Sequence, residues 1–597
     1  MSSSPAESAA DSAAAVGWDL ADLYAATDDP ALDRDLEAAD REAAELAADY
    51  RGRLDGLDAA GLAGLVTRYE ACLERAGRAG SYAHLSWSTD TGDAARGALL
   101  QKLTERSARL HQTLLFFELE WAALPEEQAE ELEADERLAH YRHFLRVTRR
   151  TRPHLLTEPE ERVLSEKSVT GRRAWIRYFD EVHGAAKFQL DGAEIQREEL
   201  LNTLHQADRP LRQRAAAGLT EGLRALLPTS TFVFNTLLAD KAAEDRMRSF
   251  PSWISDRNLD NQVDGAVVDA LVSAVVGRYD IVERYYRLKR RLLDVDELFD
   301  YDRYAPLAAE SRRYHWDDAV ETVLSAYRRF NGRLGEQAAR FFDNAWIDAP
   351  IRPRKRGGAF CHSCVPSVHP YLLLNYQGQP RDVMTLAHEL GHGVHGLLAA
   401  PRGYLQFHTP LTTAETASVF GEMLVFRDLI DREGDRRERL AMLVRRIEDT
   451  FATVFRQTAM NRFEEAIHEA RRSDGELTQE RFAELWLSTQ RAMFGDSVTL
   501  SDDYGAWWSY IPHFVHTPGY VYAYSFGELL VLALYARYRE VGDSFADSYV
   551  EMLAAGGSDW PHRIMQPLGV DLTDPGFWDR GLAMVEQMVE QAEELAA

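Results

Sequence analysis

Two histidines four residues apart, with a glutamate beside the first, are the residues of this sequence best suited to chemistry. His388, Glu389 and His392 lie in the run HELGH, inside a segment whose apolar residues recur at helical spacing. On a helix, residues four apart share one face, so both imidazoles can bind one metal ion. Glu389 lies one step around the helix, close enough to activate a water molecule held there. This HExxH arrangement is typical of zinc peptidases.

The third ligand decides which class of zinc peptidase the pattern indicates. Metzincins place a further histidine six residues after the second one, where this sequence has Leu398. Thermolysin-like enzymes place a glutamate about 19 or 20 residues on, where Leu411 and Thr412 stand. No acidic residue lies between His392 and Glu415. Glu415 is therefore the predicted third ligand, and a His₂Glu site leaves a fourth position for water.

The elements that must position these side chains also have sequence signals. Asp382 precedes the apolar run and predicts the start of the metal helix. Residues 371–376 predict a strand, which could pair with an extended peptide. Thr412 or Thr413 predicts the cap of a second helix, with Glu415 in its first turn.

Other polar residues near the motif are expected to play supporting or incidental parts. Glu422 returns to the same helical face as Glu415, so it could orient a ligand histidine or be an ordinary surface acid. His395 is expected to pack or hydrogen-bond locally. Cys361 and Cys364 form a lone CxxC, which makes a poor structural zinc site without a second pair. We expect a loop with incidental cysteines, whose oxidation could still alter activity.

Three separated segments of the sequence resemble one known family. They are KRGGAFC at 355–361, HELGHGVH followed by AETASVFGE, and IPHFVHTPGYVYAY at 511–524. In type and order they resemble the oligoendopeptidase F branch of the thimet oligopeptidase family. The resemblance implies a mainly α, two-lobed helical zincin with a small β-sheet beside the active site and a deep substrate channel.

The resemblance also implies an activity and a set of residues for it. It indicates a zinc-dependent endopeptidase, with one Zn²⁺ per chain, that hydrolyses internal bonds of short unstructured oligopeptides. The metal ligands carry over to His388, His392 and Glu415, and the general base carries over to Glu389.

A histidine and tyrosines near the C-terminus steady the tetrahedral intermediate in this family. The matching catalytic positions are His513 and Tyr524, with Tyr520 and Tyr522 as substrate-binding residues. Tyr524 is our first choice for the tyrosine that stabilises the intermediate. On a helix, Tyr520 and Tyr524 would share one face while Tyr522 points elsewhere. At least one of the three is expected to be an aromatic residue of the core.

Two other functions fit the same motif. A zinc carboxypeptidase could use this site to trim peptide C-termini, because the site alone does not determine which bond is cleaved. A non-hydrolytic peptide-binding protein could also hold a metal, although mere binding would not require Glu389.

Composition excludes several other classes of function. Formal net charge is 68 − 96 = −28, which disfavours nucleic acid and anionic membranes as partners. No run approaches the length of an apolar membrane span, and the N-terminus shows no secretory signal. Three cysteines cannot form a disulfide framework. We therefore expect a cytoplasmic protein, and the sequence does not determine its oligomeric state.

Helical periodicity predicts the organisation of the chain. Residues 1–14 are expected to be disordered, 15–185 to form a helical N-terminal lobe, and 186–597 to form the catalytic domain. Asp191-Gly192 predicts a small hairpin near the boundary. Further helices are predicted at 436–463 and 478–494.

Overall fold

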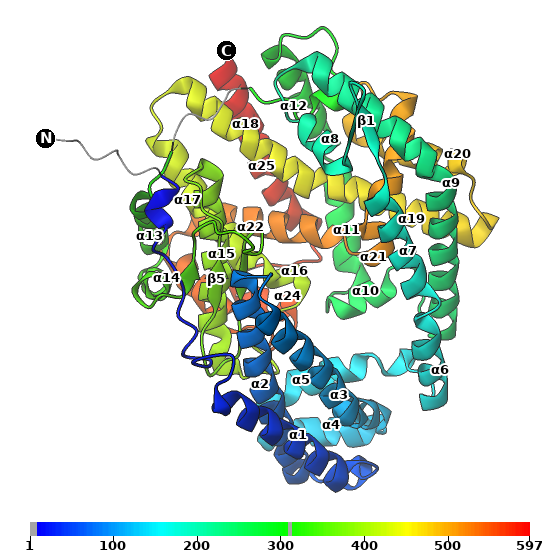
Figure 1. The fold of residues 1–597 in the computed structure, drawn as a ribbon, viewed down its shortest axis with the longest axis vertical. Coiled ribbons are helices and arrows are strands. Elements are labelled where there is room, and N and C mark those ends of the chain that lie inside the picture. Colours follow the sequence, from blue (N-terminus) through cyan, green and yellow to red (C-terminus); the bar gives the residue numbers. More distant parts are fainter. Residues whose placement is uncertain (1–8, 308–312) are drawn as a thin grey trace, which may run out of the picture. The chain divides into compact units, whose positions relative to one another are not determined.

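The computed structural model describes residues 9–307 and 313–597, so residues 1–8 of the predicted disordered segment lie outside the described residues. Helices form most of the described chain and the strands are short, which confirms the prediction of a mainly α protein (Figure 1). Contacts divide the chain into two compact units. Unit 1 takes the described residues of 1–152, 311–432 and 537–571, and unit 2 takes those of 153–310, 433–536 and 572–597. The predicted domain boundary near residue 186 stays a prediction.

Unit 1 holds the metal motif and most of the small sheet structure. Its helices are α1 (Pro30–Tyr50), α2 (Ala59–Thr89), α3 (Ala94–Ala123), α4 (Glu126–Ala134), α5 (Arg142–Arg150), α13 (Trp316–Phe330), α14 (Gly332–Asp343), α15 (Pro380–Ala399), α16 (Leu411–Ala414), α17 (Thr416–Arg432), α23 (Asp543–Ala554) and α24 (Pro561–Met565). Its strands are β3 (Ile347–Asp348), β4 (Phe360–His362) and β5 (Tyr371–Leu373).

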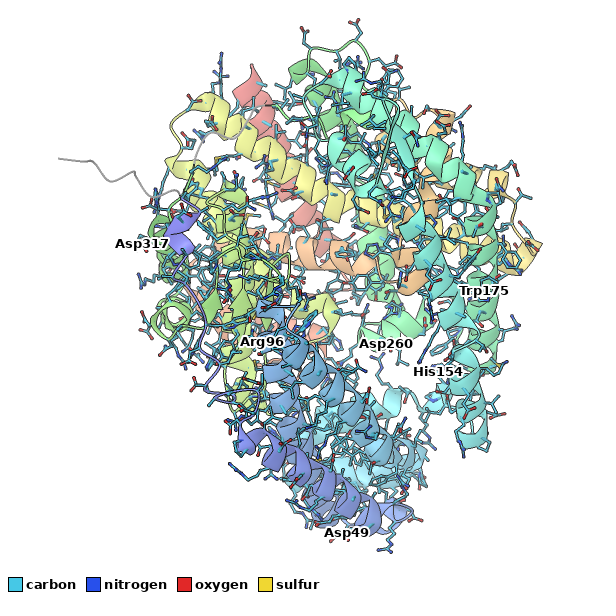
Figure 2. The ribbon with its side chains drawn as sticks, viewed as in Figure 1. Asp49, Arg96, His154, Trp175, Asp260 and Asp317 are labelled. Carbon is cyan, nitrogen blue, oxygen red and sulfur yellow. The ribbon has the colours of Figure 1, made fainter. Side chains whose placement is uncertain are left out.

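The first three helices of unit 1 pack side by side (Figure 1). Asp29, Asp58 and Asp93 cap the N-termini of α1, α2 and α3 through backbone amides of their first turns. Arg96, in the first turn of α3, donates to the carbonyl of Ser86 near the end of α2 at 2.9 Å (Figure 2). Their facing surfaces bury leucines and aromatic residues in one hydrophobic cluster.

A three-stranded sheet in unit 1 lies against the metal helix. The strand order is β3-β5-β4, with β5 parallel to β3 and antiparallel to β4. All three residues of β5 are fully buried, which explains why this strand reads as a continuous apolar run. Both β4 and β5 contact α15. The predicted strand and the predicted small sheet beside the metal helix are therefore confirmed.

Helix α15 begins three residues before the position predicted for it, which took Asp382 as the N-cap. Pro380 occupies the first helical turn, and Gln379 is the N-cap residue. The prediction that Asp382 is the N-cap is wrong. Its carboxylate instead reaches back from the third helical position and accepts the amides of Gln377 and Gln379 at 2.8 and 2.9 Å. Like a capping side chain, this carboxylate accepts backbone amides and places a negative charge at the positive end of the helix dipole.

Unit 2 is built from the middle and C-terminal segments. Its helices are α6 (Glu158–Ser168), α7 (Arg172–Ala185), α8 (Arg197–Thr203), α9 (Arg209–Met247), α10 (Ser255–Asp260), α11 (Gly265–Val276), α12 (Tyr279–Leu292), α18 (Arg436–Thr453), α19 (Phe455–Asp474), α20 (Gln479–Phe494), α21 (His513–His516) and α25 (Pro575–Ala596). Its strands are β1 (Phe188–Leu190) and β2 (Ala193–Ile195), and α22 (Tyr522–Val541) begins in unit 2 and ends in unit 1.

Two predictions for unit 2 can be compared with the structure. Strands β1 and β2 pair antiparallel across Asp191 and Gly192, which have φ of 53° and 80°, so the predicted hairpin is confirmed. The single helix predicted at 436–463 is instead two helices that meet at Val454. Ser525 donates its hydroxyl to the carbonyl of Val454 at 2.8 Å, an interaction that sequence periodicity does not reveal.

Within the described parts of the chain, no helix has the combination of length and apolar character that a membrane crossing requires.

Candidate metal centre

Helix α15 presents its two predicted ligand histidines on one face. Its opposite face is anchored in the core, where Leu386, Leu390 and Val394 are at most 1% exposed. His388 and His392 keep 27% and 25% of their side chains exposed, and their ring centroids are 4.9 Å apart. The helical spacing of four residues therefore places the two imidazoles as the sequence predicts.

Glu415 completes a cluster with the two imidazoles. Its Oε2 lies 3.3 Å from Nε2 of His388 and 3.3 Å from Nε2 of His392. Glu415 is not in the first turn of the second helix, as we predicted, but at the junction between α16 and α17. Ser418 donates its hydroxyl to the same Oε2 at 2.7 Å. The hydroxyl thus fixes the carboxylate oxygen that points toward the histidines.

Two glycines allow the helices that carry these residues to cross closely. A Cβ on Gly391 of α15 would lie 2.5 Å from the carbonyl oxygen of Ala417 and 2.6 Å from Cα of Ser418. A Cβ on Gly421 of α17 would lie 2.0 Å from the hydroxyl of Tyr327. Tyr327 belongs to α13, but the same Cβ would also lie 3.1 Å from the carbonyl oxygen of Ala387 in α15. Glycine at these two positions therefore allows α17 to lie close to α15, and this approach brings Glu415 to the histidines.

Glu422 lies behind the ligand face, where the sequence suggested that it could orient a histidine. Its Oε1 is 2.5 Å from Nδ1 of His388, which leaves Nε2 directed toward Glu415. Burial lowers the pKa of His388, but the hydrogen bonds to Glu415 and Glu422 outweigh it and raise that pKa to about 11. The two carboxylates therefore make this position strongly favourable for a positive charge.

Glu389 is buried beside the cluster, with 7% of its surface exposed. Burial raises the pKa of Glu389, while His388 and His392 oppose that rise. The backbone amide of Cys361 in β4 faces its carboxylate. A raised pKa makes a carboxylate a better proton acceptor, which is what a general base in hydrolysis requires.

The donor set fits a catalytic divalent metal ion. Ligand atoms of His388, His392 and Glu415 all lie within 4.8 Å of one another, the one such group found among the described residues. Two imidazoles and one carboxylate form the His₂Glu set of catalytic zinc sites, which leaves a coordination position open. His395 is not part of the group and is 8% exposed. Burial lowers its pKa to about 4.

The other predicted catalytic residues form a second cluster, within unit 2. His513 opens the short helix α21, and its Nε2 lies 3.1 Å from the hydroxyl of Tyr524. The Tyr520 ring lies 5.0 Å from that of Tyr524 and is nearly parallel to the imidazole of His513 at 6.3 Å. Burial lowers the pKa of His513, and Arg456 lowers it further. Both effects favour the neutral imidazole, which keeps one N–H donor.

Tyr522 does not share this environment. It begins α22 and is 0% exposed. Its hydroxyl accepts a hydrogen bond from Nδ2 of Asn261 at 2.8 Å. The assignment of Tyr522 as a substrate-binding residue is therefore corrected, because a fully enclosed side chain with a bonded hydroxyl cannot contact a peptide. Tyr522 is the aromatic core residue that the sequence led us to expect among the three.

Sequence reasoning missed two residues that support the metal cluster. Ser418 lies one helical turn after Glu415, a spacing that would have pointed to a contact between them. Tyr327 is 1% exposed and donates its hydroxyl to the carbonyl of Ala387, at 2.9 Å, in the middle of α15. Nothing in the sequence links Tyr327 to the motif, because the two are far apart along the chain.

Comparison with known proteins gives consistent matches over most of the chain. The pattern of Peptidase family M3 matches residues 202–584, and that of Oligopeptidase F matches residues 120–188. Oligopeptidase PepF of Bacillus subtilis is 27% identical over 600 residues, covering 97% of this chain and 87% of the relative. Group B oligopeptidase PepB of Streptococcus agalactiae is 26% identical and covers 86% and 87% of the two chains.

Solved structures have the same fold. A peptidase candidate from Chlamydophila abortus has a TM-score of 0.89 at 23% identity, covering 97% of this chain and 98% of that one. Oligoendopeptidase-F from Enterococcus faecium has a TM-score of 0.70 at 24% identity, covering 94% and 98%. At these sequence identities, the similarity to the solved structures is evidence for a shared fold alone.

Proposed function

Because this chain belongs to peptidase family M3, we propose that it holds one zinc ion at His388, His392 and Glu415 and hydrolyses internal bonds of short, unstructured peptides. The chain is a metalloendopeptidase. The observation that carries the assignment of its site is the approach of both histidine Nε2 atoms to one oxygen of Glu415, each at 3.3 Å.

Glu389 is the proposed general base. A zinc ion at this site supplies Lewis acidity, which lowers the pKa of water toward neutrality and polarises the scissile carbonyl. Glu389 takes a proton from the attacking water and returns it to the leaving amine. Its burial, which raises the pKa of its carboxyl group, supports the first of these steps because a higher pKa makes the carboxylate a stronger base.

His513 and Tyr524 are the proposed donors to the developing oxyanion. The contact between them supports this part of the proposal, since an Nε2–H of His513 that donates to the Tyr524 oxygen leaves the Tyr524 hydroxyl proton free for the oxyanion. A fixed donor directed at the oxygen that gains charge stabilises the transition state more than the ground state. Tyr520 packs against both rings and is proposed to contact the substrate.

We also propose that the protein works in the cytoplasm. Its three cysteines are free, which fits a reducing compartment.

Product analysis of a defined peptide set tests the proposal. Peptides of graded length, each with both termini blocked and in a second form with a free C-terminus, are incubated with the zinc-loaded protein, and the products are identified by mass spectrometry. Internal cleavage of doubly blocked peptides is the expected result. Cleavage confined to peptides with free C-termini would identify a carboxypeptidase instead. Stable binding without cleavage would identify a non-hydrolytic peptide-binding protein.

The Glu389→Gln variant tests the mechanism in the same assay. It should retain zinc, because Glu389 is not among the ligands, and lose turnover by about 100-fold or more. Glu127→Gln, at an exposed position in the first turn of α4, is the matched control and should leave turnover unchanged. Near-normal activity of Glu389→Gln would show that another group activates the water.

A further inference from the structure

Arg456 is a half-buried arginine with no carboxylate partner among the residues that the structure describes. It lies in the first turn of α19, and its Nη1 donates a hydrogen bond to the hydroxyl of Tyr304 at 3.3 Å. The chain has 96 acidic and 68 basic side chains, so carboxylates are abundant. A partly desolvated guanidinium that lacks a counterion favours the binding of an anion from solution.

The other cations near Tyr304 are enclosed and have acceptors of their own. Lys289 has 0% of its side chain exposed and pairs with Glu448. Arg303 is 4% exposed, lies over the Tyr304 ring at 5.2 Å, and donates Nε to a backbone carbonyl at 2.9 Å. Neither can meet a ligand from solution. Arg456 differs from both, because as a residue it keeps partial exposure.

The charge of Arg456 acts on the residues proposed for catalysis in the same unit. Burial is the main cause of the lowered pKa of His513, and the positive charge of Arg456 is the second cause. Burial raises the pKa of Tyr304, but Arg456 and Arg303 outweigh it and lower that pKa overall. Both effects require the guanidinium to lie close to these side chains. An anion bound by Arg456 would therefore lie near the imidazole that contacts Tyr524.

We propose, on the basis of the function proposed above, that Arg456 binds a carboxylate of the peptide substrate and so selects peptides that carry a negative charge. The planar guanidinium presents paired N–H donors that match the two oxygens of a carboxylate. The Tyr304 hydroxyl, already bonded to Arg456, supplies a further donor beside it. The carboxylate is either the free C-terminus of the peptide or the side chain of an aspartate or glutamate.

Binding measurements on a non-hydrolysing form of the enzyme test this selection. The zinc-loaded Glu389→Gln protein is titrated by calorimetry with three versions of one cleavable peptide: a free C-terminus, an amidated C-terminus, and amidated versions with glutamate placed at each position in turn. Tighter binding of the first version identifies a C-terminal carboxylate as the ligand. Tighter binding of one glutamate version identifies an acidic side chain and its position.

Substitution of Arg456 then shows whether this residue causes the preference. Adding Arg456→Gln should weaken binding of the preferred carboxylate peptide by about 10-fold or more, the usual worth of a charge-assisted hydrogen bond, and leave the neutral amide peptide unaffected. Arg456→Lys should retain part of the preference, since it keeps the charge and loses the paired donors. Arg437→Gln, at an exposed position in the first turn of α18, is the control and should change neither affinity.

Two results would overturn the assignment of Arg456. One is equal affinity of the Glu389→Gln protein for the carboxylate and amide peptides, a result that does not depend on the folding of an Arg456 variant. The other is an equal loss for both peptides on substitution, with an unchanged circular dichroism spectrum. Failure of the zinc-loaded wild-type chain to cleave any of these peptides, with the binding preference intact, would instead refute the proposed hydrolysis alone.

Discussion

Replacing Gly391 with alanine should disturb the metal site through the backbone of the neighbouring helix. The new Cβ would lie 2.5 Å from the carbonyl oxygen of Ala417, 2.6 Å from Cα of Ser418 and 2.8 Å from the carbonyl carbon of Ala417. Ordinary contact begins at 3.4 Å, so the two helices must separate by 3.4 − 2.5 = 0.9 Å. All three atoms belong to the backbone, so no side chain can rotate away to relieve the contact.

The expected cost can be estimated from two opposing effects. Overpacking of this kind destabilises a protein by about 1–3 kcal/mol, while alanine gains about 1 kcal/mol over glycine inside a helix. Because the contact is entirely with backbone, we take the upper part of the first range and expect a net loss of about 2 kcal/mol. The shift also exceeds the ~0.2 Å tolerance of metal–ligand distances. Ser418, which holds Glu415, lies at the contact itself, so zinc affinity should fall by about 10- to 100-fold.

Two measurements on the purified variant check this estimate. Thermal unfolding of the metal-free protein reports the packing cost, and competition with a chelator reports the zinc affinity. Gly64→Ala is the matched control, since Gly64 lies in helix α2 and a Cβ added there would meet no neighbouring atom within 4 Å. This control should gain about 0.5–1 kcal/mol. If Gly391→Ala unfolded at the wild-type temperature and bound zinc as tightly, the close crossing of α15 and α17 would not be what fixes Glu415.

Three further perturbations have defined outcomes. Glu422→Gln should weaken zinc binding by about 10- to 100-fold, because it removes the charged partner of His388; unchanged affinity in a chelator titration would exclude that role. Tyr524→Phe should lower kcat by about 100- to 1,000-fold with little change in KM, as expected for a donor to the oxyanion; a change confined to KM in steady-state kinetics would assign the hydroxyl to substrate binding. Burial raises the pKa of Glu464 from 4.5 to about 8. Between these two pH values the folded protein keeps a proton that the unfolded chain has released, so the stability of the folded protein falls as pH rises. Glu464→Gln keeps an acceptor for the amide of Gly519 and should reduce the fall in melting temperature between pH 6 and pH 9. If the wild type and the variant showed the same difference in melting temperature, Glu464 would titrate normally.

The cluster of His388, His392 and Glu415 could be predicted from the sequence because the information for it is local. Four-residue spacing places His388 and His392 on one face of any helix. The long stretch without an acidic residue leaves Glu415 as the third ligand, and spacing along α17 brings Glu422 to the same side. These inferences do not depend on where a helix starts. The helix starts themselves were predicted less well, since Asp382 and Glu415 both occupy positions other than the predicted ones.

The remaining features depend on contacts between distant segments. The break at Val454 involves the hydroxyl of Ser525, and the burial of Tyr522 involves Asn261. The isolation of Arg456 from carboxylates can be recognised only when every neighbour is known. Periodicity along one segment carries no information about such partners, so the helical content was predictable while these side-chain environments were not.

The order in which the ribosome delivers these segments has a consequence for when the contacts around Glu415 can be completed. Tyr549, in α23, donates its hydroxyl to the carbonyl of Thr416 at 2.9 Å, at the start of α17 and next to Glu415. The HELGH helix and Glu415 leave the ribosome more than a hundred residues earlier than this tyrosine. A growing chain therefore lacks the tyrosine that bonds to the start of α17 until all the residues between Glu415 and Tyr549 have been made. The contacts around Glu415 can be completed only after α23 has packed against helices that were made before it.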